Sequence, residues 1–144
     1  MAERIDGTLA FNVEVPRQLL ADLLCTAVEG GSNYWAEFRA TKRTADLDYL
    51  QVKMTEREAS REGQPRVNRY IDLQDLATGL QRLAAAALAY ARATGEDTDD
   101  WLAKKHKGFQ TAGEHLGDAL AERGDAITAD VVLQMAVFGE VIYG

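Results

Sequence analysis

The chain has 144 residues, of which 47% are apolar and 27% are charged, values that fit one soluble globular domain spanning residues 1–144. Sixteen basic and 23 acidic residues give a net charge of −7. The chain therefore lacks the positive field on which most nucleic-acid binding depends, and DNA or RNA is not the expected partner. A single cysteine excludes an internal disulfide. The longest apolar run, residues 83–91, is far shorter than the roughly 20 residues that span a bilayer. We therefore expect a cytoplasmic protein without membrane contact.

The first half of the chain is predicted to contain most of the sheet. Apolar and polar residues alternate in four stretches, which predicts four strands, at residues 9–15, 34–40, 50–54 and 67–71. A leucine-rich stretch with helical spacing lies between the first two strands. We expect it to form a helix that starts after Pro16, ends near Glu29 and is closed by Gly30 in the left-handed conformation. The charged stretch from Thr55 to Pro65 is typical of an exposed connection, across which the third and fourth strands form an antiparallel hairpin.

The second half of the chain is predicted to be helical. Asp72 is placed to cap a helix whose apolar stripe begins at Leu73, and Gly95 is its expected stop. A short helix is expected at residues 111–121. Residues 129–138 are apolar in every direction of a helix, which is typical of a helix surrounded by protein, at the centre of the fold or at a subunit contact. This order of elements predicts an α+β fold with an antiparallel sheet of about four strands packed against three or four helices.

The turn from Glu29 to Trp35 is the candidate functional segment. An amide and two large aromatic rings follow a glycine pair directly after a helix, in the kind of loop that commonly carries function. In one interpretation Glu29 and Asn33 line a pocket together with the rings of Tyr34 and Trp35, which stack on a planar ligand while the amide binds its edge. In the other interpretation Trp35 covers the sheet and Asn33 caps a turn.

Other residues with reactive side chains form weaker patterns. Cys25 lies near the buried face of a helix with no neighbouring base or cation in sequence, so it is interpreted as a small core residue. Four residues have the types found in metal sites but lack the close, repeated spacing of zinc ligands, and no metal is predicted; they are His106, Glu114, His115 and Asp118. Residues 101–109 combine lysines with aromatic rings after an acidic stretch and are interpreted as a solvated loop, with a local anion contact left open.

Several familiar catalytic and cofactor signatures are absent from the sequence. It has no phosphate-binding glycine loop, no dinucleotide fingerprint and no nucleophile elbow. We therefore predict no catalytic residue and no cofactor.

Two segments, Thr26–Trp35 (TAVEGGSNYW) and Ala129–Gly144 (ADVVLQMAVFGEVIYG), together resemble a family of short, uncharacterised proteins encoded by tailed bacteriophages. The resemblance covers only these two segments and transfers no catalytic role. It implies a viral accessory protein that acts inside a bacterium, in host takeover or defence evasion.

Both segments join the end of a helix to glycine and then to aromatic or apolar residues. This shared pattern leads us to expect that they pack against each other. The side chains expected around one shared concavity are those of Glu29, Asn33, Tyr34, Trp35, Gln134 and Glu140.

The first functional expectation is a non-enzymatic binding or interaction protein. It is expected to form a homo-oligomer, by default a symmetric dimer, because its C-terminal helix is apolar all round. A host protein or a small-molecule ligand is a further expected partner. The alternative is a small enzyme or sequestering protein that acts on a nucleotide-like molecule at the Glu29–Trp35 turn. Nucleic-acid mimicry is a third hypothesis, and it requires the acidic residues to gather on one surface.

Overall fold

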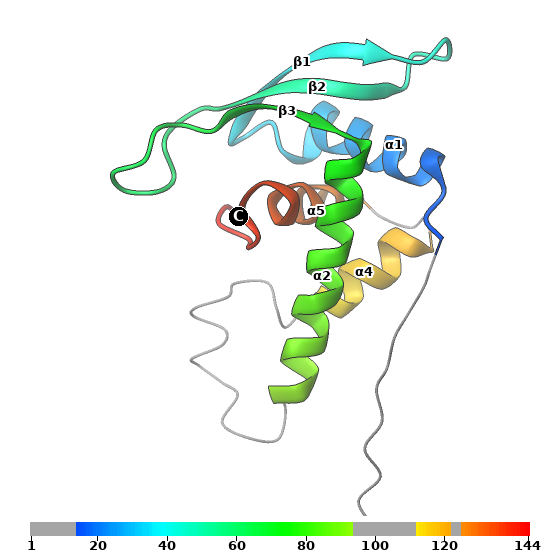
Figure 1. The fold of residues 1–144 in the computed structure, drawn as a ribbon, viewed down its shortest axis with the longest axis vertical. Coiled ribbons are helices and arrows are strands. Elements are labelled where there is room, and N and C mark those ends of the chain that lie inside the picture. The colour runs from blue at the N-terminus through cyan, green and yellow to red at the C-terminus, as the bar shows by residue number, and fades with distance from the viewer. Residues whose placement is uncertain (1–13, 94–111, 122–124) are drawn as a thin grey trace, which may run out of the picture.

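A computed structural model describes residues 14–93, 112–121 and 125–144. The fold is α+β, with an antiparallel sheet lying over a group of helices (Figure 1). In chain order the elements are α1 (Arg17–Thr26), the π-helical turn η1 (Ala27–Gly31), β1 (Ala36–Arg43), β2 (Tyr49–Glu56), β3 (Asn68–Asp72), α2 (Leu73–Ala93), α4 (Ala112–Leu120) and α5 (Ala126–Phe138). The predicted fold class is confirmed.

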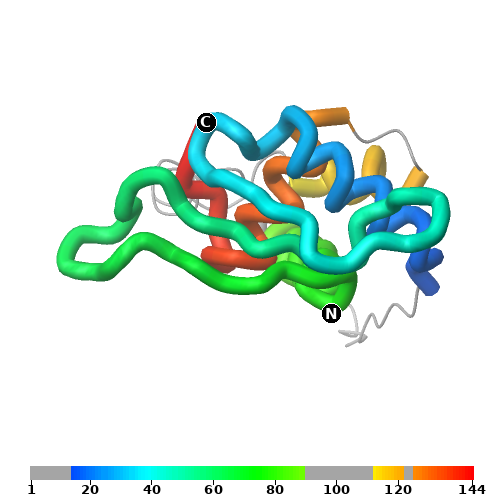
Figure 2. Tube along the Cα trace, turned by 90° about the horizontal axis from the view of Figure 1, so that it is seen from above, coloured from blue at the N-terminus to red at the C-terminus, as the bar shows by residue number. Residues whose placement is uncertain are grey.

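The described sheet has three strands in the order β1-β2-β3 rather than the expected four (Figure 2). The predicted hairpin between β2 and β3 is confirmed, with Val52 opposite Ile71. The strand expected at residues 9–15 lies outside the described residues except for Glu14 and Val15. These two residues lead into α1 without forming a strand. The start of the helix directly after Pro16 agrees with the prediction.

The buried face of the sheet follows the two-residue period of the sequence. Among the side chains that point toward the helices, those of Ala36, Val52, Met54 and Ile71 are fully buried. The residues between them are exposed or only partly buried. One face of the sheet therefore packs on the helices, and the described helices leave the other uncovered (Figure 1).

Helix α1 buries the predicted leucine face, but its end differs from the prediction. The helix widens into the π turn η1 and leads to Ser32, whose amide donates to the carbonyl of Ala27. Gly30 has no positive φ, so it is not a left-handed cap. Gly31 is the residue that needs to lack a side chain, because a Cβ there would overlap the carbonyl oxygen of Ala126. Gly31 therefore allows the chain to approach α5 closely.

The helices of the second half agree with the sequence pattern. Asp72 caps α2 by accepting from the amide of Asp75 at 3.0 Å, as predicted. The expected stop at Gly95 lies outside the described residues. Helix α5 begins at the N-cap Asp125 and ends at Gly139, whose φ of 76° is left-handed. Its residues from Thr128 to Ala136 are all buried. The apolar helix is therefore at the centre of one chain, and its composition needs no subunit contact to explain it.

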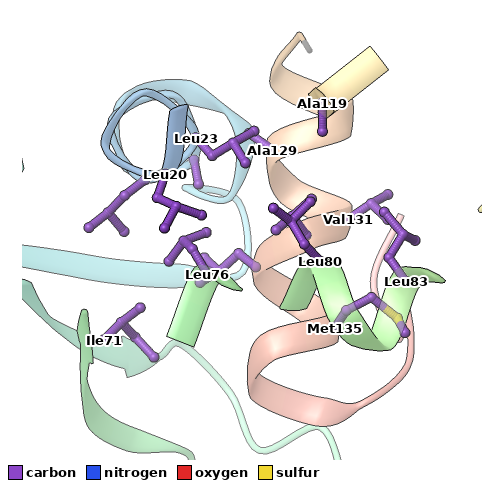
Figure 3. Close-up of a cluster of buried hydrophobic side chains, with 14 of the residues drawn as sticks. Leu20, Leu23, Ile71, Leu76, Leu80, Leu83, Ala119, Ala129, Val131 and Met135 are labelled. Carbon is purple, nitrogen blue, oxygen red and sulfur yellow. The ribbon is translucent and has the colours of Figure 1, made fainter. Parts of the chain in front are cut away.

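The core lies where α5 crosses α2 and α1. Leucine side chains from α1 and α2 surround residues of α5 (Figure 3); the labelled ones include Leu20, Leu23, Leu76, Leu80, Leu83, Val131 and Met135. Gly79 of α2 allows this close crossing, because a Cβ at that position would overlap the carbonyl oxygen of Val132.

Candidate functional site

The candidate site is a buried polar cluster centred on Asp130 of α5. One carboxylate oxygen accepts from the hydroxyl of Ser32 at 2.7 Å and from the indole N–H of Trp35 at 2.8 Å. The other accepts from the hydroxyl of Tyr34 at 2.6 Å and from the amide of Gln134 at 3.0 Å. Asp130 is only 7% exposed. These four bonds provide donors for a carboxylate that has lost most of its contact with water.

Gln134 joins this cluster to the C-terminal segment. Its side-chain oxygen accepts from the backbone amides of Ile142 and Tyr143, each at 2.8 Å, and its amide nitrogen donates to the carbonyl of Tyr143 at 3.2 Å. Gln134 is completely buried. Its side chain therefore fixes a segment that has no helix or strand of its own.

The ring of Tyr143 packs on the indole of Trp35. The two rings are nearly parallel, at 11°, with centroids 5.0 Å apart. Phe138 contacts the same indole with centroids 5.4 Å apart. Trp35 is only 2% exposed as a result. The structure therefore gives Trp35 the packing role of the second interpretation, with its N–H bound to Asp130 and its ring covered by the C-terminal segment.

A second buried carboxylate, that of Glu56 in β2, anchors the other end of Tyr143. The Tyr143 hydroxyl donates to one oxygen of Glu56 at 2.6 Å, and the amide of Val67 donates to the other at 3.0 Å. Burial works against the charged form of Glu56, but hydrogen bonds from Ser60, Tyr143 and Val67 outweigh it and lower the pKa of this carboxyl.

The two tyrosines that bind these carboxylates stay protonated over a wide pH range. Burial raises the pKa of Tyr34, and its hydrogen bond to Asp130 raises it further. The pKa of Tyr143 is raised in the same way, by burial and by its bond to Glu56. Both hydroxyls therefore act as donors to a negative charge rather than as bases.

Glu56 makes the stability of the fold depend on pH in a defined direction. Its pKa is lower in the folded state than its ordinary value of 4.5, so its stabilisation is fully present above that pH and is lost as the pH falls through the lowered value. We expect Glu56→Gln to lower the free energy of unfolding by about 1–2 kcal/mol at neutral pH. Urea unfolding of both proteins should give a smaller difference at about pH 3. A difference that stays constant with pH would contradict this role.

Two arginines bind the C-terminal end of α5. Arg82 of α2 donates to the carbonyls of Met135 and Ala136, at 2.9 and 2.7 Å. Arg61 donates to the carbonyl of Phe138 at 3.1 Å, and its guanidinium lies 5.4 Å from the centroid of that ring. Both cations bind carbonyls at the end of the helix and favourably oppose its dipole. These contacts hold the helix end from which the C-terminal segment departs.

The structure brings together the segments Thr26–Trp35 and Ala129–Gly144, as expected from the sequence, and Figure 2 shows the C-terminal end beside the chain that leads into β1. Of the predicted site residues, Tyr34, Trp35 and Gln134 meet at Asp130. Glu29 is exposed in η1. The side chain of Asn33 is exposed as well, while its backbone carbonyl accepts from Arg57 at 2.8 Å.

The six residues expected around one concavity do not all come together in the structure. Glu140 is half-buried just after α5, with no bond to the Asp130 cluster. A shallow hollow of about 250 Å³ lies between α2 and α5 instead, and its lining residues are Arg82, Ala85, Ala86, Ala89, Met135 and Gly139. None of the six residues predicted to form a ligand site contributes to it. Ligand binding by those six residues stays a prediction.

Sequence reasoning missed Asp130, Ser32 and Glu56. The signal for Asp130 was present, because a carboxylate four residues before Gln134 places two polar side chains on one face of an otherwise apolar helix. Such a pair in a fully buried helix needs partners from another element.

Cys25 and His115, which belong to the weaker sequence patterns, have structural roles. Burial raises the pKa of the Cys25 thiol, which is half-buried and accepts weakly from the amide of Tyr49. His115 on α4 bonds to the hydroxyl of Thr128 at 3.0 Å. His106 and residues 101–109 lie outside the described residues. Among the residues that are described, no three His, Cys, Asp or Glu side chains are grouped closely enough to hold a metal ion.

Comparison of the chain with protein families, with curated proteins and with solved structures finds no match. Within the described ranges, no helix combines the length and the apolar character that crossing a membrane requires.

Proposed function

We propose that the protein is a non-enzymatic interaction module, a phage accessory protein that works in the bacterial cytoplasm by contact with other protein chains. The resemblance of Thr26–Trp35 and Ala129–Gly144 to short phage proteins supports the viral setting. Those segments are also the ones that meet at Asp130, so the residues that carry the resemblance build the fold.

One observation carries this proposal. The parallel stack of Tyr143 on Trp35 occupies the place where a planar ligand would lie, and Asp130 uses both oxygens to bind side chains of the chain itself. Catalytic groups need a reacting atom within reach and at least one donor or acceptor free to serve it. In this cluster the donors and acceptors serve the fold, which leaves the outer surface to perform the function.

A nucleotide-like ligand remains the alternative function, for one structural reason. The segment that covers Trp35 has no regular secondary structure, and Gln134 binds its backbone through both ends of the side-chain amide, as it could bind the edge of a base. A ligand that used this place would have to displace Tyr143. The two functions therefore differ in a measurable way.

Tryptophan fluorescence distinguishes them. The chain has two tryptophans, so Trp101→Phe leaves Trp35 as the only indole. We expect nucleoside mono-, di- and triphosphates at about 1 mM to leave the emission of Trp35 unchanged. A ligand that binds more weakly than about 1 mM gains too little binding energy to displace the packed ring of Tyr143.

The proposal would be overturned by a saturable change in emission with two properties. The change would be larger in the protein that also carries Tyr143→Ala, and it would be unaffected by Tyr70→Ala. Tyr70 is the matched control, because it is an exposed tyrosine on the far face of the sheet. No change in any variant supports an interaction module.

A further inference from the structure

Strand β1 forms an edge of the sheet. Within residues 14–93, 112–121 and 125–144, β2 is the only strand paired with it. It is also the least buried strand, since only Ala36 is fully buried among its eight residues. Helix α1 packs near β2 and helix α2 near β3, so the helical layer is set back from β1. Such an edge presents unpaired backbone groups to any chain that can pair with them.

The register between β1 and β2 shows which backbone N–H and C=O groups of β1 point away from the sheet. The amide of Arg57 donates to the carbonyl of Trp35, and bonding to β2 alternates from there along β1. Glu37 and Arg39 thus bond to β2, whereas the backbone groups of Phe38 and Ala40 point away from it. The amide of Ala36 is already bound to the carbonyl of Ser32, at 3.2 Å.

The sequence along this edge is complementary to a second, antiparallel copy of itself. Residues 36–40 read Ala-Glu-Phe-Arg-Ala. In an antiparallel pair centred on Phe38, the two phenylalanines lie opposite each other, and each Glu37 lies opposite the other chain's Arg39. Centring the pair on Glu37 or on Arg39 would place like charges directly opposite, which is unfavourable. Among pairs centred on Glu37, Phe38 or Arg39, charge therefore favours the one centred on Phe38.

We infer that two copies of the chain pair through β1 about a two-fold axis at Phe38, forming one continuous six-stranded sheet. This inference rests on the proposed interaction function and names its first partner, a second copy. Each Phe38 amide donates to the partner's Phe38 carbonyl, and each Ala40 amide donates to the partner's Ala36 carbonyl. The bound amide of Ala36 is not needed for this ladder, and a two-fold pair of this kind closes on itself.

The side chains on both faces of the strand fit such a pair. Phe38 is half-buried at the inner side of the edge, and the partner's ring would cover it. On the outer face, Glu37 is exposed and bonded to Arg57 at 3.0 Å. A carboxylate has acceptor sites for a second guanidinium, so it can bind the partner's Arg39 without giving up Arg57.

A charge swap tests this interface in the full chain. Sedimentation velocity from about 1 to 200 μM covers the range expected for an interface of modest size. We expect a concentration-dependent dimer for the wild type. Glu37→Arg places two arginines opposite each other, and Arg39→Glu places two glutamates opposite each other. Each should weaken the dimer by at least about tenfold, because both symmetric contacts change from attraction to repulsion.

The double variant with Glu37→Arg and Arg39→Glu restores opposite charges across the axis and should restore the dimer. Glu62→Arg is the control, since it reverses an exposed charge in the connection between β2 and β3, outside β1. It should leave the dimer unchanged. Circular dichroism and thermal unfolding check that every variant is folded.

Hydrogen exchange of the wild type locates the contact independently of any variant. The amides of Phe38 and Ala40 should exchange more slowly as the protein concentration rises, while those of Tyr70 and Ile71 in β3 should not change. A dimer without this protection, or one insensitive to both single reversals, overturns the inference but leaves an interaction function standing. A strict monomer over the whole range overturns the inference and the self-association that the proposed function includes.

Discussion

Replacing Asp130 with alanine is expected to lower the free energy of unfolding by about 3–5 kcal/mol, because it removes the shared acceptor of a buried cluster. The hydroxyl of Ser32 and the indole N–H of Trp35 would lose their partner in a site that water does not reach. Urea unfolding at neutral pH measures the change. Asp130→Asn keeps one acceptor oxygen but turns an NH₂ group toward the donors, so it should lose about 2 kcal/mol.

Asp46→Ala is the control for this prediction. Asp46 is exposed in the connection between β1 and β2, so its loss should change the free energy of unfolding by less than about 0.5 kcal/mol. If Asp130→Ala were as mild as Asp46→Ala, the cluster would not hold the Ser32–Trp35 turn and helix α5 together.

The second large effect is expected at Gly79, where alanine should destabilise the fold by about 2–3 kcal/mol. A glycine inside a helix normally costs stability, and replacing it with alanine normally recovers it. At Gly79 alanine is expected to lower the stability instead, because the added methyl would overlap the carbonyl oxygen of Val132 and lie 3.2 Å from Cβ of Ala136. Helices α2 and α5 would have to move apart where they cross in the core.

Gly117→Ala in α4 is the matched control, since no atom lies within 4 Å of the added Cβ. It should raise the free energy of unfolding by about 0.5–1 kcal/mol. Thermal unfolding of the two variants beside the wild type gives both signs in one experiment. Stabilisation by Gly79→Ala would show that the two helices are not in close contact at this crossing.

Local patterns in the sequence predicted the elements that depend on local spacing. The leucine stripe of α1, the cap at Asp72 and the alternation in β2 each follow from a short stretch of chain. The all-apolar character of α5 also predicted its burial. It left open whether the cover came from the same chain, which the structure shows, or from another.

Long-range contacts were harder to predict. Asp130 meets Ser32 and Trp35 across 98 and 95 positions in the sequence. No local period encodes such a meeting, and a single carboxylate within an apolar run was overlooked for that reason. The need for glycine at positions 31 and 79 was equally hard to predict. It arises from the nearby backbone of α5 rather than from the turn or helix to which each glycine belongs.

The Glu29–Trp35 turn packs against the C-terminal segment, as predicted, but its residues have different roles from the predicted ones. Tyr34 and Trp35 bind Asp130, while Glu29 and the side chain of Asn33 face the surroundings. Aromatic rings next to a glycine pair are a pattern that suggests a ligand site. Here the ring that covers Trp35 is Tyr143 of the same chain.

Hydrogen exchange at the amides of Ile142 and Tyr143 tests most directly that the C-terminal segment is fixed by α5. Both amides donate to Gln134, whose own position depends on Asp130. We expect them to exchange nearly as slowly as the core amides of α5 in the wild type and to lose that protection in Asp130→Ala. Exchange at the rate of an unstructured peptide in the wild type would contradict the account.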